Sequence, residues 1–134
     1  MYQLSFPVRH QYSEGSQGIT VEVLLRSNDL ELRIPAKVDT GAEFCVFSRD
    51  IAEALDIVVE AGQLQKMRTL TGVFDTYGHE MSYSTLGHDF TGTLYFAADQ
   101  EFSRNVLGRR GWLDRLRIGI IDYDRSLLIA DYNS

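Results

Sequence analysis

The amino-acid sequence predicts an all-β domain, a barrel or a sandwich, with one or two short helices. Stretches rich in β-branched residues alternate with turn-forming residues at a spacing of roughly 8–12 residues, which is typical of such folds. With 134 residues and no internal repeat, the chain has the length of one domain. It contains only two prolines and no low-complexity tract, so no linker is predicted.

The first part of the domain begins with a predicted β-hairpin. Residues 19–25 are rich in β-branched side chains, residues 27–29 have turn chemistry, and residues 30–34 alternate apolar and polar side chains. Pro35 has no amide donor, which indicates a sheet edge or a bulge. The continuous apolar run 44–47 then predicts a short buried strand.

The remaining elements follow the same logic. Ser48 is a suitable N-cap for a helix at 49–55, and a second short helix is predicted at 109–116. Further strands are predicted at 67–70, 76–83, 91–97, 117–122 and 126–130. Residues 1–17 are left as an unassigned N-terminal extension, and the domain is placed at 18–134.

The charge of the chain argues against nucleic acid as a partner. The formal net charge is −6, which repels phosphate backbones. The arginines between Arg104 and Arg117 are interrupted by Asp114, so they are interpreted as a solvated face with ion pairs. The three histidines are far apart and lack metal-ligand spacing, so no metal site is expected.

The absence of a targeting pattern and the single cysteine give expectations about the protein's location in the cell. The sequence has neither a signal-peptide pattern nor an apolar segment of membrane-spanning length, so we expect a cytoplasmic protein without a membrane partner. Cys45 is the only cysteine, which excludes an intrachain disulfide. Because it lies in the apolar run 44–47, Cys45 is interpreted as a small buried hydrophobe rather than a nucleophile.

One triplet stands out against this background. Asp39-Thr40-Gly41 directly follows a predicted strand and precedes Ala42 and an apolar run. An isolated Asp-Thr-Gly is compatible with a simple β-turn. Here, however, the context would hold an acid in a tight turn at the edge of a core.

The order of motifs resembles that of the retroviral-type, or retropepsin-like, aspartic proteases. After the triplet come an apolar strand, a helix and a glycine-bearing hairpin, and then Val106-Leu107-Gly108-Arg109 before a predicted terminal helix. The resemblance covers roughly residues 18 to 130. It implies a closed acid-protease barrel and an aspartic endopeptidase that needs no cofactor.

The resemblance also implies a homodimer. Aspartic proteases need two carboxylates that share one proton, and this chain supplies a single Asp-Thr-Gly. Two copies of Asp39 would therefore meet across a two-fold axis. Thr40 would hydrogen-bond across that axis, and Gly41 would let the backbone of a peptide substrate approach closely.

Further roles follow from the same resemblance. A flap near residues 71–74 would close over bound peptide, so Gly72, Val73 and Phe74, together with Ala42, are predicted to contact substrate. Leu107 and Gly108 would support the catalytic loop, and Glu43 would form an ion pair with Arg109. The apolar candidates for the cleft walls are Phe44, Val46, Val73, Phe74 and Trp112.

Two alternatives remain open at this stage. The same fold can serve as a catalytically inactive dimerisation or peptide-binding module, because fold does not imply function. The chain could also be a small β-barrel of unrelated function in which the triplet occurs by chance. An intact Asp39-Thr40-Gly41 favours the enzyme over the inactive module.

Overall fold

The computed structural model describes residues 1–15 and 18–133. The strands are β1 (Val8–Gln11), β2 (Thr20–Ser27), β3 (Leu30–Val38), β4 (Val46–Phe47), β5 (Gln63–Thr69), β6 (Gly72–Thr85), β7 (His88–Ala97), β8 (Val106–Leu107), β9 (Leu116–Ile121) and β10 (Ser126–Asp131). The helical segments are α1 (Arg49–Ala54) and the 3-10 turns η1 (Val59–Ala61), η2 (Leu113–Arg115) and η3 (Asp122–Asp124).

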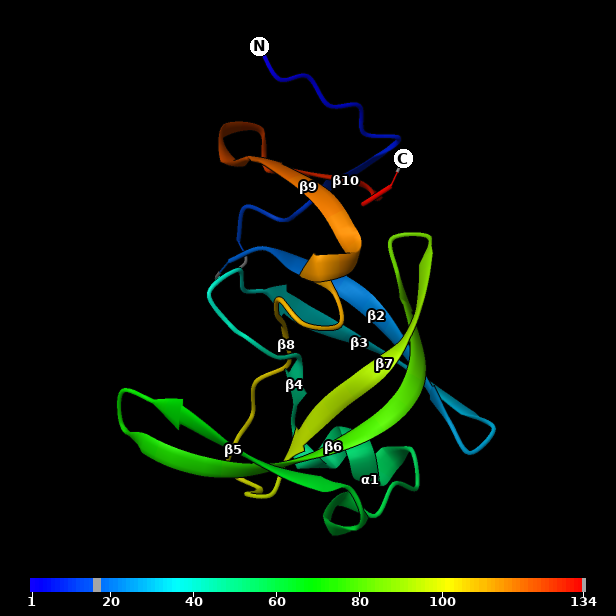
Figure 1. The fold of residues 1–134 in the computed structure, drawn as a ribbon, viewed down its shortest axis with the longest axis vertical. Helices are drawn as coiled ribbons and strands as arrows, with labels where there is room; N and C mark the ends of the chain where they lie inside the picture. The colour runs from blue at the N-terminus through cyan, green and yellow to red at the C-terminus, as the bar shows by residue number, and fades with distance from the viewer. Residues whose placement is uncertain (16–17, 134) are drawn as a thin grey trace.

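The larger sheet closes on itself. Its strands follow the order β2-β3-β8-β4-β7-β6-β5, and an additional pairing of β2 with β6 completes a ring. The predicted all-β closed barrel is therefore confirmed. Strand β5 lies outside the ring, and the β5–β6 hairpin projects from the barrel at the end opposite the two chain termini (Figure 1).

The period-two pattern of the strands places the core inside this ring. In β2, Val21, Val23 and Leu25 are buried, whereas the intervening Glu22 is exposed. The facing strands contribute large buried side chains such as Phe47 and Phe96. Burying these apolar side chains is the main contribution to stability, at about 1.5–3 kcal/mol for each large one.

The smaller sheet joins the two ends of the chain. Strand β10 lies between β1 and β9 and is antiparallel to both. Next to this sheet, the Tyr12 hydroxyl donates a hydrogen bond of 2.5 Å to Asp122 Oδ1, and this bond is the main reason that the pKa of Tyr12 is raised to about 12. The unassigned extension 1–17 thus contains a strand that the sequence analysis did not predict.

The other predicted elements compare well with the structure. The first hairpin, α1 and the two closing strands are confirmed. Pro35 lies at a free edge as predicted, because in the described chain β3 pairs with a second strand only from Lys37 onward. The helix predicted at 109–116 is wrong. Gly111 has φ of +97°, which breaks a right-handed helix, so only the short turn η2 forms.

No helix in the described part of the chain is long and apolar enough to cross a membrane.

Candidate active site

The predicted catalytic triplet forms a tight loop at the end of β3. The Asp39 amide donates a hydrogen bond to Leu107 O at 2.9 Å, and Asp39 Oδ1 accepts one from the Gly41 amide at 3.0 Å. The Ala42 amide donates to Asp39 O at 3.1 Å, which closes the turn. Asp39, Thr40 and Gly41 are all exposed, so the loop presents its carboxylate at the surface of this chain.

The segment around β8 crosses beneath this loop. Val38 pairs with Leu107 in parallel, and beyond β8 the amides of Arg109 and Arg110 donate to Ala42 O and Glu43 O, both at 2.8 Å. Backbone hydrogen bonds therefore join this segment to the loop.

Gly108 is the tightest point of the crossing. A Cβ atom built on it would meet Phe44 O and would lie 2.7 Å from Ala42 O, both backbone atoms. Only glycine allows the two segments to approach this closely.

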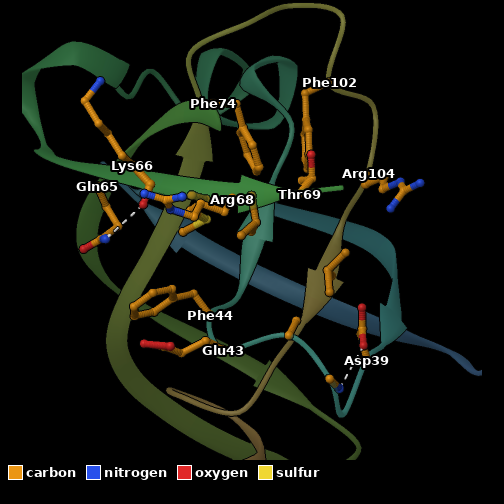
Figure 2. Close-up of a pocket in the computed structure, with 15 residues that line it drawn as sticks. Asp39, Glu43, Phe44, Gln65, Lys66, Arg68, Thr69, Phe74, Phe102 and Arg104 are labelled. Atoms are coloured by element: carbon orange, nitrogen blue, oxygen red, sulfur yellow. Dashed lines mark hydrogen bonds between the residues drawn. The ribbon is translucent and has the colours of Figure 1, made fainter. Parts of the chain in front are cut away.

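A pocket of about 530 Å³ opens above the loop (Figure 2). Its floor is formed by the loop that carries Asp39, Ala42 and Glu43, and its roof by β5. Its apolar lining side chains are Phe44, Val46, Met67, Phe74, Phe102 and Val106. The pocket thus lies between an exposed carboxylate on its floor and a roof in which Met67 is the one apolar residue that β5 contributes to the lining.

The β5–β6 hairpin forms that roof, and its turn lies at Leu70 and Thr71, because Thr69 pairs with Gly72. Phe74 is half-buried and stacks on Phe102, with ring centroids 5.1 Å apart and an interplanar angle of 20°. Of the residues predicted for the flap, only Phe74 lines the Asp39 pocket, whereas Gly72 and Val73 line a neighbouring hollow.

Two predicted roles are wrong. Trp112 does not line the cleft, because it is fully buried in the core. Glu43 does not pair with Arg109: its Oε1 lies 3.5 Å from Arg110 Nε, and Arg109 has no ion pair within the described chain. The Arg110 amide donates to Glu43 O, whereas the Arg109 amide donates to Ala42 O, so Arg110 is the arginine that lies beside Glu43. The observed pair is exposed on both sides.

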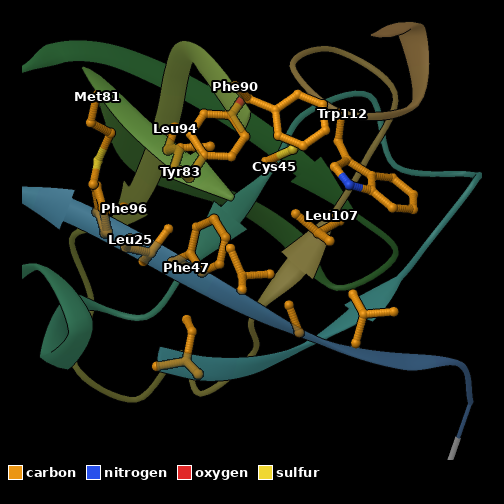
Figure 3. Close-up of a cluster of buried hydrophobic side chains, with 14 of the residues drawn as sticks. Leu25, Cys45, Phe47, Met81, Tyr83, Phe90, Leu94, Phe96, Leu107 and Trp112 are labelled. Atoms are coloured by element: carbon orange, nitrogen blue, oxygen red, sulfur yellow. The ribbon is translucent and has the colours of Figure 1, made fainter. Parts of the chain in front are cut away.

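Cys45 contacts the crossing at Gly108 and belongs to the buried cluster that also contains Leu107 and Trp112 (Figure 3). Its Sγ accepts a hydrogen bond from the Gly108 amide at 3.4 Å and donates one to Arg110 O at 3.6 Å. Burial raises the pKa of the thiol to about 11, so at neutral pH it is protonated and not a nucleophile. The sequence-based interpretation of Cys45 as a small buried hydrophobe agrees with this geometry.

The described residues contain no group of three His, Cys, Asp or Glu side chains that could hold a metal ion. The three histidines have other contacts: His10 and His79 hydrogen-bond to Thr20 O and Val59 O, and His88 lies 3.3 Å from Asp131 Oδ1.

Several pocket residues were missed by the sequence analysis, notably Met67, Phe102 and Arg104. Phe102, Arg104 and Val106 line the pocket at every second position. This alternation is the signal that could have identified them, but it lies in a segment with few β-formers.

Comparison with known protein families agrees with this geometry. A family model described as aspartyl protease matches residues 20–110. The chain belongs to this aspartyl protease family, which is part of the retropepsin-like clan. The part of the chain matched to the family runs from β2 to Arg110, so it includes the Asp39 loop, the β5–β6 hairpin and Gly108, while the terminal sheet lies outside it. No curated protein matches the chain.

Proposed function

We propose that this aspartyl protease family member is an aspartic endopeptidase that acts as a homodimer. The observation that carries the proposal is an exposed Asp39 at the floor of a pocket in which the described residues offer it no carboxylate partner. The other acid lining that pocket is Glu43, which is paired with Arg110. One chain therefore supplies half of the two-carboxylate site that this chemistry needs.

The reaction uses the two Asp39 side chains in different protonation states. Two carboxylates this close share one proton, because like charges in contact cannot both ionise. The ionised carboxylate removes a proton from water, whose oxygen attacks the peptide carbonyl carbon while the protonated carboxyl polarises the carbonyl oxygen. The C–N bond then breaks as the leaving nitrogen accepts a proton from the dyad, which restores the shared-proton state.

The neighbouring residues have supporting roles in the proposed dimer. No hydrogen bond within the described chain occupies the Thr40 hydroxyl, which leaves it available to the partner's loop. Gly41 and Ala42 keep the floor of the pocket small, so that the backbone of a bound peptide can approach Asp39. The β5–β6 hairpin acts as the flap, with Phe74 on the pocket side and Gly72 and Val73 near its turn.

The first test replaces the proposed catalytic carboxylate. Asp39→Asn should reduce kcat/KM on a cleaved peptide by about 10²–10⁴-fold while the thermal unfolding midpoint stays close to that of the wild type. Asp29→Asn is the matched control: Asp29 is exposed in the β2–β3 turn with φ of +63°, a conformation that Asn tolerates. Near-wild-type cleavage by Asp39→Asn would refute the catalytic role.

The second test addresses the shared site. Mixed dimers of wild type and Asp39→Asn hold one intact carboxylate, so excess Asp39→Asn should inhibit the wild type, and specific activity should fall on dilution. A monomer that cleaves at undiminished specific activity would contradict the dimer. A wild type that dimerises and binds peptides but cleaves none would instead support the inactive binding module.

A further inference from the structure

One wall of the Asp39 pocket is an extended segment that leads into β8. Phe102, Arg104 and Val106 line the pocket, whereas Asn105 turns to the other side, where its Oδ1 accepts a hydrogen bond of 3.1 Å from the Ser48 amide. Alternation along an extended chain therefore sets Arg104 between two apolar side chains on the pocket wall.

Arg104 differs from the paired charges around it. Lys66 Nζ lies 2.9 Å from Asp75 Oδ1, and Glu43 is paired with Arg110. Arg104 is exposed and has no carboxylate within 4.0 Å among residues 1–15 and 18–133. The chain carries 19 acidic and 13 basic side chains, so an arginine without a carboxylate in this pocket is not explained by a shortage of acids.

Arg68 also borders the pocket and has no ion pair within the described residues, but its position differs. It lies opposite Val73 in the β5–β6 hairpin, on the same face as Lys66. The other face of the hairpin carries Met67 and Phe74, which are half-buried over the pocket. Arg68 is therefore the control for Arg104. It carries the same charge and borders the same pocket, but its side chain starts from the outer face of the β5–β6 hairpin.

We infer that Arg104 makes the site selective for peptides with an acidic side chain next to the cleaved bond. This inference rests on the proposed function and specifies its substrate class. A guanidinium binds a carboxylate through two parallel hydrogen bonds, and the flanking Phe102 and Val106 limit the access of water to that pair. Because Arg104 and Asp39 line the same pocket, the side chain that reaches Arg104 belongs to a residue near the scissile bond.

The aromatic side chains beside Arg104 predict a second preference, for an apolar side chain in the peptide. The stacked Phe74 and Phe102 form an apolar platform beside Arg104. A peptide that places Asp or Glu against Arg104 can therefore place an apolar side chain on that platform. In a two-fold dimer the same pair of subsites recurs on the other side of the cut.

The experiment compares peptides that differ at a single position. A peptide cleaved by the wild type is made with Glu, Gln or Lys at each position flanking the cut. At the selective position, wild-type kcat/KM should favour Glu over Gln on the order of tenfold. Arg104→Gln should bring this ratio close to one, and Arg104→Glu should favour Lys. Arg68→Gln, the matched control, should keep the wild-type ratio.

Binding to Asp39→Asn separates this inference from catalysis. Fluorescence anisotropy with the same labelled peptides should show the same preference for Glu, weakened by salt. Wild-type cleavage with equal Glu and Gln rates, or an unchanged ratio in Arg104→Gln, would overturn the inference and leave the protease proposal intact. Preference in binding without any cleavage would support the inference and overturn the catalytic proposal. Binding of none of the peptides would overturn the inference.

Discussion

The floor and the roof of the pocket are held in different ways. The Asp39 loop is fixed by backbone hydrogen bonds to Leu107 and to the residues after it. The β5–β6 hairpin projects beyond the barrel, because β6 pairs with β7 only from Thr76 onward. Its turn is fully exposed at Leu70, and on the pocket side Phe74 stacks on Phe102. The position of Asp39 thus depends on backbone hydrogen bonds, whereas the shape of the pocket roof depends on side-chain packing.

The largest effect is expected where the floor is most crowded. Gly108→Ala would push a methyl group into the carbonyl oxygens of Phe44 and Ala42, so we expect a loss of about 3 kcal/mol in the free energy of unfolding, together with most of the activity. Gly119→Ala is the control, because its nearest neighbouring atom would be Phe6 Cζ at 3.4 Å. Urea titration measures both variants, and equal stabilities would show that the crossing is not rigid.

A smaller effect is expected in the roof. Phe102→Ala removes a half-buried ring and its stack on Phe74, which should cost about 1–2 kcal/mol of stability. Because the hairpin then loses a contact with the opposite wall, KM for a peptide substrate should rise severalfold while kcat changes less. Phe102→Leu should restore most of the apolar contact. A fall in kcat without a change in KM would show that the Phe74–Phe102 stack affects the Asp39 loop rather than the β5–β6 hairpin.

A still smaller effect is expected from the ion pair at the edge of the floor. Glu43 and Arg110 are both more than half exposed, so Arg110→Ala should change the free energy of unfolding by no more than about 1 kcal/mol. Arg109→Ala is the comparison, since Arg109 has no ion pair in the described chain. A double-mutant cycle with Glu43→Gln measures the coupling. Strong coupling of Glu43 to Arg109 instead would restore the pair predicted from the sequence.

The smallest effect is expected at Cys45, whose thiol should hardly react in the folded chain. Since burial raises the pKa of this thiol to about 11, iodoacetamide at pH 8 should label it far more slowly in the folded chain than in urea. The ordinary value is 9.0, so the folded state holds the proton more tightly than the unfolded state. This contribution to stability is complete below pH 9 and is lost as the pH rises toward 11.

Cys45→Ala should show a shallower loss of stability over that pH range, measured by urea titration at several pH values. Equal labelling rates in the folded and unfolded chain would show that the Cys45 thiol is accessible to solvent and not buried beneath the Asp39 loop.

The strands and the triplet could be predicted because their signals are local. Period-two alternation and β-branched residues identify β2 and β3. The acid in the loop after β3 is recognisable because a strand, a small residue and an apolar run surround it. Strand β1 was missed because Val8 is its only aliphatic residue and its partner, β10, lies at the other end of the chain.

The errors concern side-chain direction and backbone conformation. Spacing alone does not decide whether Arg109 or Arg110 reaches Glu43, since this depends on which of the two is hydrogen-bonded to the Glu43 backbone after folding. A helix was predicted at 109–116, but the left-handed φ of Gly111 prevents it. Trp112 looked like a cleft residue because the sequence does not show which side of the crossing faces the core.

The pairing of β1 with β10 has a consequence for the order of folding. Arg9 Nε donates to Ser126 Oγ at 2.9 Å, so this contact joins residues separated by 117 positions. Contacts between such distant residues form slowly because a long loop must close first. During synthesis, β1 has no partner until the segment containing β10 has left the ribosome. Pulse-labelling hydrogen exchange should therefore find the β1 amides among the last to gain protection, after those of the β6–β7 hairpin.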